Sequence, residues 1–61
     1  MTTKCYNLIA CNDCWLAIEN INNFIPCFTE HRHLGDNIIE FTITCRDEDI
    51  AFVEKNLAPF V

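Results

Sequence analysis

The chain has 61 residues, of which 51% are hydrophobic, and its nine acidic and four basic side chains give a net charge of −5. This length allows one domain, residues 1–61, which buries only about 60% of the surface that its unfolded chain exposes, so a self-sufficient enzyme is not expected. The composition argues against a disordered chain, and the acidic balance disfavours direct binding to nucleic acid or to an anionic membrane surface.

The cellular location follows from the first residues and from the cysteines. The apolar run at the start is interrupted by Asn7, Asn12 and Asp13, so it has neither a signal peptide's apolar region nor a membrane span. We therefore expect a cytoplasmic protein. In that reducing compartment the five cysteines, an odd number, are interpreted as core residues or metal ligands rather than as a disulfide framework.

The first predicted strand, residues 4–10, precedes the first predicted helix. One strand face comprises Tyr6, Leu8 and Ala10, and the other comprises Cys5, Asn7 and Ile9. From residue 12 the apolar period becomes helical, with a stripe of Cys14, Ala17, Ile18, Ile21, Phe24 and Ile25. We expect Asn12 or Asp13 to cap this helix and Pro26 to end it.

Two extended stretches follow, separated by the turn cluster Gly35-Asp36-Asn37. The later stretch, residues 39–45, alternates apolar and polar residues and predicts a strand with one buried face. The earlier stretch, residues 27–34, is expected to be an edge strand, because charge discourages unwanted strand pairing. Its charged and imidazole side chains are Glu30, His31, Arg32 and His33.

The last predicted element is a helix that begins after an acidic cluster, Asp47, Glu48 and Asp49. We expect Asp47 to cap it and the cluster to complement the positive end of its dipole. The apolar side chains Ile50, Val53, Leu57 and Phe60 follow at helical spacing. Because Pro59 cannot continue the helix, its end is expected near Ala58.

The order strand, helix, strand, strand, helix predicts an α+β fold. It matches a ferredoxin-like split βαββα two-layer sandwich with an antiparallel sheet and a missing fourth strand. In this topology the strand of residues 39–45 lies between the other two. The first strand is then an open edge, and we expect it to pair with a second copy in a homodimer.

The chemistry of the chain is concentrated in Cys11 and Cys14, which lie where the first strand meets the first helix. Two such thiols can hold a soft metal ion or exchange between dithiol and disulfide. Cys14 also belongs to the apolar stripe, so a purely structural role stays open. A thioredoxin-like redox site is disfavoured, because that fold needs a longer chain and a proline opposite the cysteines.

The segment Ile9-Ala10-Cys11-Asn12-Asp13-Cys14-Trp15-Leu16-Ala17-Ile18-Glu19 resembles the first loop and helix of heavy-metal-associated domains, the copper-chaperone family. These domains place a Cys-x-x-Cys pair after the first strand of a ferredoxin-like fold, often followed by an Ile-Glu pair. The resemblance implies that Cys11 and Cys14 are thiolate ligands of Cu(I) or zinc. A mixed zinc site that adds His31 and His33 is a further alternative, although the predicted topology separates the histidines from the cysteines by about 10 Å.

Two functions from different classes remain. One is a small, acidic, non-enzymatic protein-interaction module, and the other is a soft-metal binder that uses Cys11 and Cys14. The candidate interaction residues are Trp15, Phe52, Asp47, Glu48 and Asp49. Trp15 and Phe52 are aromatic side chains that could anchor a protein partner, cover the sheet or close a dimer. No serine is present, so a serine nucleophile is excluded.

Overall fold

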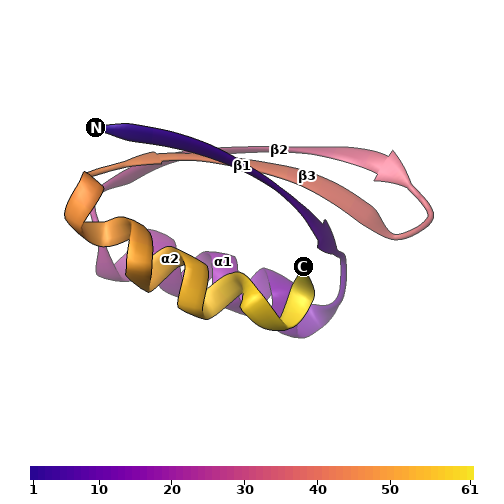
Figure 1. Ribbon diagram of the computed structural model, residues 1–61. Helices are drawn as coiled ribbons and strands as arrows, with labels where there is room; N and C mark the ends of the chain where they lie inside the picture. Colours follow the sequence, from indigo (N-terminus) through magenta and orange to yellow (C-terminus); the bar gives the residue numbers. More distant parts are fainter.

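The computed structural model describes residues 1–61 and contains three strands and two helices (Figure 1). In chain order the elements are β1 (Thr2–Ile9), α1 (Asn12–Phe24), β2 (Cys27–Gly35), β3 (Ile38–Cys45), a 3₁₀ turn (Asp47–Asp49), α2 (Ile50–Leu57) and a second 3₁₀ turn (Ala58–Phe60). This order confirms the predicted α+β fold and matches the first five of the six elements of a ferredoxin-like domain. Helix α1 ends just before Pro26 and helix α2 just before Pro59, as proline requires.

The sheet is antiparallel with the strand order β1-β3-β2, so β3 lies in the centre and both β1 and β2 are edges. Every residue of β1 is paired with β3 in one unbroken register, from Thr2 opposite Cys45 to Ile9 opposite Ile38. Both helices cover the same face of the sheet and leave the other face open (Figure 1). The molecule is therefore a two-layer sandwich.

The turn between β2 and β3 places Asp36 and Asn37 at φ angles of 52° and 61°. Two consecutive residues with positive φ are typical of the two-residue hairpin turn whose twist matches that of the strands. The Ala10 N–H donates a hydrogen bond of 2.7 Å to the Asn37 carbonyl, which ties the turn to the end of β1. The predicted turn cluster is confirmed.

The core lies between β3 and the two helices. Its fully buried side chains are Leu8, Cys14, Ile21, Ile39, Ile43, Cys45, Val53 and Leu57, with Phe41 1% exposed. The alternation predicted for β3 is confirmed, since every second residue of the strand is buried. Phe24, assigned to the apolar stripe of α1 from the sequence, is instead 73% exposed and packs its ring against Phe52.

The predicted helix caps are wrong. Cys11 is the N-cap residue of α1, and neither Asn12 nor Asp13 occupies that position; no side chain caps this helix. Asp49 is the N-cap of α2, and Asp47 begins a separate 3₁₀ turn without capping it. The Asp47 carboxylate instead accepts a hydrogen bond from the Thr2 hydroxyl, because β1 and the start of the turn lie side by side. Neither helix has the length and apolar character needed to cross a membrane.

Candidate functional site

The two cysteines of the strand-to-helix junction differ in exposure. Cys11, the N-cap residue of α1, is exposed, whereas Cys14 on the first turn is fully buried. Burial raises the pKa of the Cys14 thiol, and a charge on nearby Cys11 would raise it further, while a hydrogen bond with the Cys11 backbone acts in the opposite direction. The buried thiol therefore resists conversion to the thiolate that binds metals.

The wider metal site considered from the sequence does not assemble. No three His, Cys, Asp or Glu side chains of the chain are grouped so that they could share one metal ion. The combination of both cysteines with His31 and His33 is therefore absent. A metal ion at the junction would have two sulfur ligands, Cys11 and Cys14, and no third protein ligand.

His31 and His33 were expected to lie on an edge strand. Both are exposed, but they lie opposite the core residues Phe41 and Ile39 and so share the face of β2 that the helices cover. The Trp15 ring on α1 meets the His31 ring edge-on, with centroids 5.0 Å apart, and lies 6.2 Å from the His33 ring. Trp15 thus covers the β2 side of the sheet, one of the roles anticipated for it.

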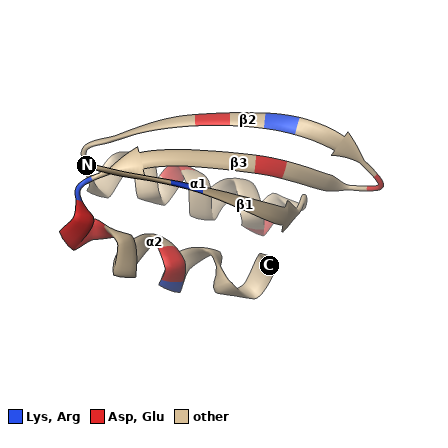
Figure 2. Cartoon of the chain, turned by 45° about the horizontal axis from the view of Figure 1, so that its top comes forward, with Lys and Arg blue, Asp and Glu red and all other residues tan.

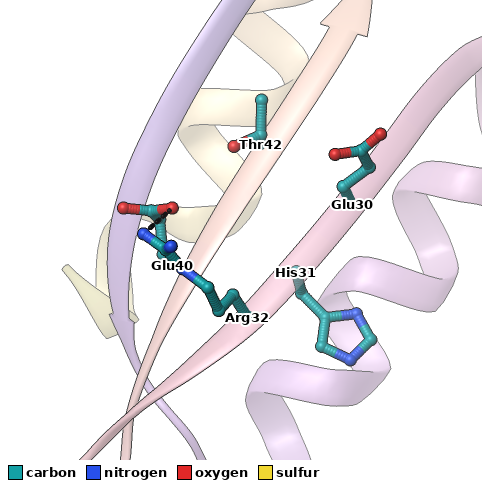
Figure 3. A pocket seen from close by; sticks show the side chains of 5 residues that line it. All are labelled: Glu30, His31, Arg32, Glu40 and Thr42. Atoms are coloured by element: carbon teal, nitrogen blue, oxygen red, sulfur yellow. Dashed lines mark hydrogen bonds and ion pairs between the residues drawn. The ribbon is translucent and has the colours of Figure 1, made fainter.

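The other face of β2 carries an ion pair. Arg32 crosses to β3, where its Nη2 lies 2.9 Å from Oε1 of Glu40, beside a shallow hollow that Glu30 and Thr42 also line. Figure 3 shows this pair as a dashed line and shows the His31 ring directed toward α1. The charges of β2 and its imidazoles therefore occupy opposite faces of the strand.

The two sheet edges are unequal. Edge strand β2 has a bulge between His33 and Gly35 and carries two charged side chains on its open face. Edge strand β1 is regular, contains no proline or glycine, and has Lys4 as its only charged side chain. The Lys4 ammonium lies 3.6 Å from the Glu54 carboxylate of α2, which offsets its charge. Of the devices that normally protect an edge, β2 has several and β1 almost none.

The acidic cluster before α2 is engaged within the chain. Asp47 lies 3.6 Å from the N-terminal ammonium, and Asp49 and Glu48 lie 2.9 Å and 3.5 Å from Nε of Arg46. Figure 2 shows these acidic residues together at the turn between β3 and α2. These contacts within the chain account for the acidic residues at the turn. The acidic cluster therefore offers a protein partner less charge than the sequence indicates.

The helix layer has a shallow groove between α1 and α2. Phe52 lines it, half-buried, with Leu16 on the opposite helix and Phe60 at its end. Phe24, next to Phe52, is exposed although it belongs to an apolar stretch. Phe52 therefore closes the contact between the helices rather than projecting alone into solvent.

No protein-family model, curated protein or solved structure matches this chain. The resemblance to heavy-metal-associated domains stays a prediction. The contact of Trp15 with the histidines was not anticipated from the sequence. The spacing of His31 and His33 predicts that both lie on one face of their strand, but it does not identify which face the helices cover.

Proposed function

We propose that this protein is a small, acidic, non-enzymatic interaction module that self-associates through the open edge of β1. The observation that carries the proposal is the unprotected state of that strand. Its outer side has no partner strand within residues 1–61, its register is unbroken, and its one charge is compensated by Glu54. A regular edge of this kind is a template for a further strand.

A second copy is the simplest partner for this edge. Residues directly opposite each other in an antiparallel pair point to the same face of the sheet. The two-fold axis of a symmetric β1–β1 pair must therefore pass between two copies of the same residue. The central residues of β1 are Cys5 and Tyr6. Pairing centred on either one joins the two sheets into a continuous sheet with all four helices on one side.

Electrostatics favour the pair centred on Cys5. In that register Lys4 of each copy lies opposite Tyr6 of the other, and the Tyr6 hydroxyl already donates a hydrogen bond to Glu54. Each ammonium then approaches the aromatic ring and the carboxylate of the partner. The register centred on Tyr6 would instead place Lys4 of each copy opposite the apolar Leu8 of the other, without these contacts.

Light scattering combined with size-exclusion chromatography at micromolar concentration tests the proposal, with a dimer as the expected result. Cys5→Lys adds a charge at the centre of the edge and should give a monomer. Thr42→Lys is the matched control, because Thr42 is the partner of Cys5 in the register and lies one strand further from the edge. This variant should remain a dimer. A monomeric wild type, or a dimer that only Thr42→Lys disrupts, contradicts association through β1.

Mild oxidation with diamide tests the register. The exposed Cys5 thiol lies on the open face of β1. The register centred on Cys5 predicts a disulfide-linked dimer that Cys5→Ser abolishes and Cys11→Ser does not. Dimerisation without this cross-link would favour the register centred on Tyr6.

A second candidate function is the binding of Cu(I) or zinc by Cys11 and Cys14, and the proximity of the two cysteines at a helix N-terminus favours it. The buried state of Cys14 is unfavourable, because the metal must displace core contacts to reach its sulfur. Titration with Cu(I) and with zinc, compared between wild type and Cys11→Ser/Cys14→Ala, separates the two functions. Unchanged binding in the variant contradicts this candidate.

A further inference from the structure

The two imidazoles of the chain and its only indole meet between β2 and α1. His31 and His33 have ring centroids 5.9 Å apart, and the Trp15 ring lies beside both. We propose that His31 and His33 together bind a divalent transition-metal ion of the class that prefers imidazole ligands, namely Cu²⁺, Ni²⁺ or Zn²⁺. This site is separate from the two thiols at the start of α1.

The backbone brings the two rings to the distance that chelation requires. Alternate residues of a strand share one face and lie about 6.6–6.8 Å apart along it. A metal–nitrogen bond of about 2.0–2.1 Å puts the ion about 3 Å from each ring centroid, so two chelating rings are at most about 6 Å apart. The observed separation of 5.9 Å lies at this limit. Chelation at this separation requires each ring to direct one nitrogen at an ion that lies between the two rings.

The imidazole nitrogens are available. None of the hydrogen bonds or ion pairs formed by side chains in the structure involves His31 or His33, and both residues are exposed. The indole of Trp15 packs edge-on against His31 and limits the rotation of that ring, which lowers the entropy lost on binding.

The charges nearby do not oppose a cation. The only arginine of the strand, Arg32, points to the opposite face and is paired with Glu40 at 2.9 Å. The whole chain carries a net charge of −5, which attracts cations over longer distances. No third protein ligand is grouped with the two imidazoles, so water completes the coordination and the affinity follows the order Cu²⁺ above Ni²⁺ and Zn²⁺, with Mn²⁺ weakest.

Trp15 provides the readout, because it is the only tryptophan and lies beside both rings. Untagged protein is titrated with Ni²⁺, whose unpaired electrons quench a neighbouring indole and which does not oxidise the thiols. We expect saturable quenching that excess Zn²⁺ reverses, since Zn²⁺ has a filled d shell and displaces Ni²⁺ without quenching. Substitution of either histidine alone should weaken Ni²⁺ binding by at least about tenfold. Tenfold is the smallest loss that is typical even when the substituted residue only hydrogen-bonds to a metal ligand.

Three variants locate the ion. His31→Asn/His33→Asn should lose the saturable quenching. Glu30→Gln is the matched control on the opposite face of β2 and should keep it, and Cys11→Ser should also keep it, which excludes the exposed thiol one turn before Trp15. Quenching that survives in the double histidine variant, or that Cys11→Ser abolishes, overturns the proposal. Absence of saturable quenching in the wild type overturns it as well.

Nuclear magnetic resonance gives an independent readout. With two histidines in the chain, one substitution assigns both sets of imidazole C–H signals. Substoichiometric Ni²⁺ should broaden these signals before any other. Broadening that begins at the N-terminal residues or at the start of α1 would place the ion elsewhere and overturn the proposal. The outcome is independent of association through β1, because β2 is the opposite edge of the sheet.

Discussion

The Tyr6 hydroxyl donates a hydrogen bond of 3.4 Å to Oε2 of Glu54 and so joins edge strand β1 to helix α2. Partial burial raises the pKa of Tyr6 above its ordinary value near 10.0, and the negative charge of Glu54 and this hydrogen bond raise it further. The Lys4 ammonium lies 3.6 Å from the same carboxylate. Glu54 therefore links the two functional groups on the helix-covered side of the β1 edge.

Titration of Tyr6, the only tyrosine, is expected to occur above the range of a free tyrosine and can be followed by tyrosinate absorbance. Because the folded-state pKa is raised, its stabilising contribution is fully present below the unfolded value near 10.0 and is lost as the pH rises through the folded-state pKa. Glu54→Gln should lower the Tyr6 pKa only in part, since burial remains. Ionisation of Tyr6 at the free-tyrosine value would contradict this contact.

The five thiols should react at different rates with iodoacetamide near neutral pH. Cys5 and Cys11 are exposed and should be modified first in dilute protein. Burial is the largest cause of the raised pKa values of Cys14, Cys27 and Cys45, and the thiolate is the reactive form, so these residues should react slowly. Mass spectrometry would show two early adducts in the native protein and uniform labelling in urea. Early labelling of Cys14 or Cys45 would mean that the core opens readily.

The fold was predictable because each element has a pattern of its own. The alternation of apolar and polar residues in β3 and the effect of the prolines after both helices are local properties of the sequence. The turn residues Gly35–Asn37 leave few alternatives for the connection between β2 and β3. The caps were mispredicted because several polar residues compete at a helix start and the winner depends on distant contacts. Asp47 binds Thr2, which is 45 positions away in the chain.

The candidate sites were predictable only in part. The junction of Cys11 and Cys14 is local and was placed correctly, but the full burial of Cys14 depends on how β3 and both helices pack around it. Similarly, the spacing of His31 and His33 predicts that both side chains lie on one face of their strand. That this face meets Trp15 is a property of the tertiary packing between β2 and α1.

Shortening an apolar side chain should destabilise the protein more when that side chain is buried than when it is exposed. Ile43 is fully buried at the centre of the sheet, and Ile43→Val should lower the free energy of unfolding by about 0.5–1.5 kcal/mol. This is a substantial part of the roughly 3–9 kcal/mol expected for a domain of this length. Ile9→Val on the open face of β1, where the side chain is 53% exposed, is the matched control and should change it by less than about 0.5 kcal/mol. Equal losses in urea denaturation would place the core elsewhere.

Acid should remove the contribution of Asp47. The hydrogen bond from Thr2, followed by the N-terminal ammonium, holds the pKa of this carboxyl below its ordinary value near 3.8. A lowered folded-state pKa means that the stabilisation is present above the unfolded value and is lost as the pH falls through the folded-state value. Asp47→Asn should therefore be less stable than wild type near pH 7, and the difference should shrink as the pH falls below the unfolded value near 3.8. A difference that persists in acid would show that the carboxylate charge is not its source.

Substitutions in the turn between β2 and β3 should change the stability of the protein through backbone conformation rather than through side-chain contacts. Gly35 has a φ of 94°, and an added Cβ would meet no atom within 4 Å, so the cost of Gly35→Ala arises from conformational strain rather than from a clash. We expect a loss of about 1–2 kcal/mol in the free energy of unfolding. Asn37→Gly is the opposite test, because Asn37 already has a positive φ of 61° and an Asp-Gly pair is favoured in such turns. This variant should be as stable as wild type or more stable. If Gly35→Ala cost nothing in urea denaturation, the bulge at the end of β2 would have to adopt another conformation, and the pairing of β2 with β3 beyond His33 would change with it.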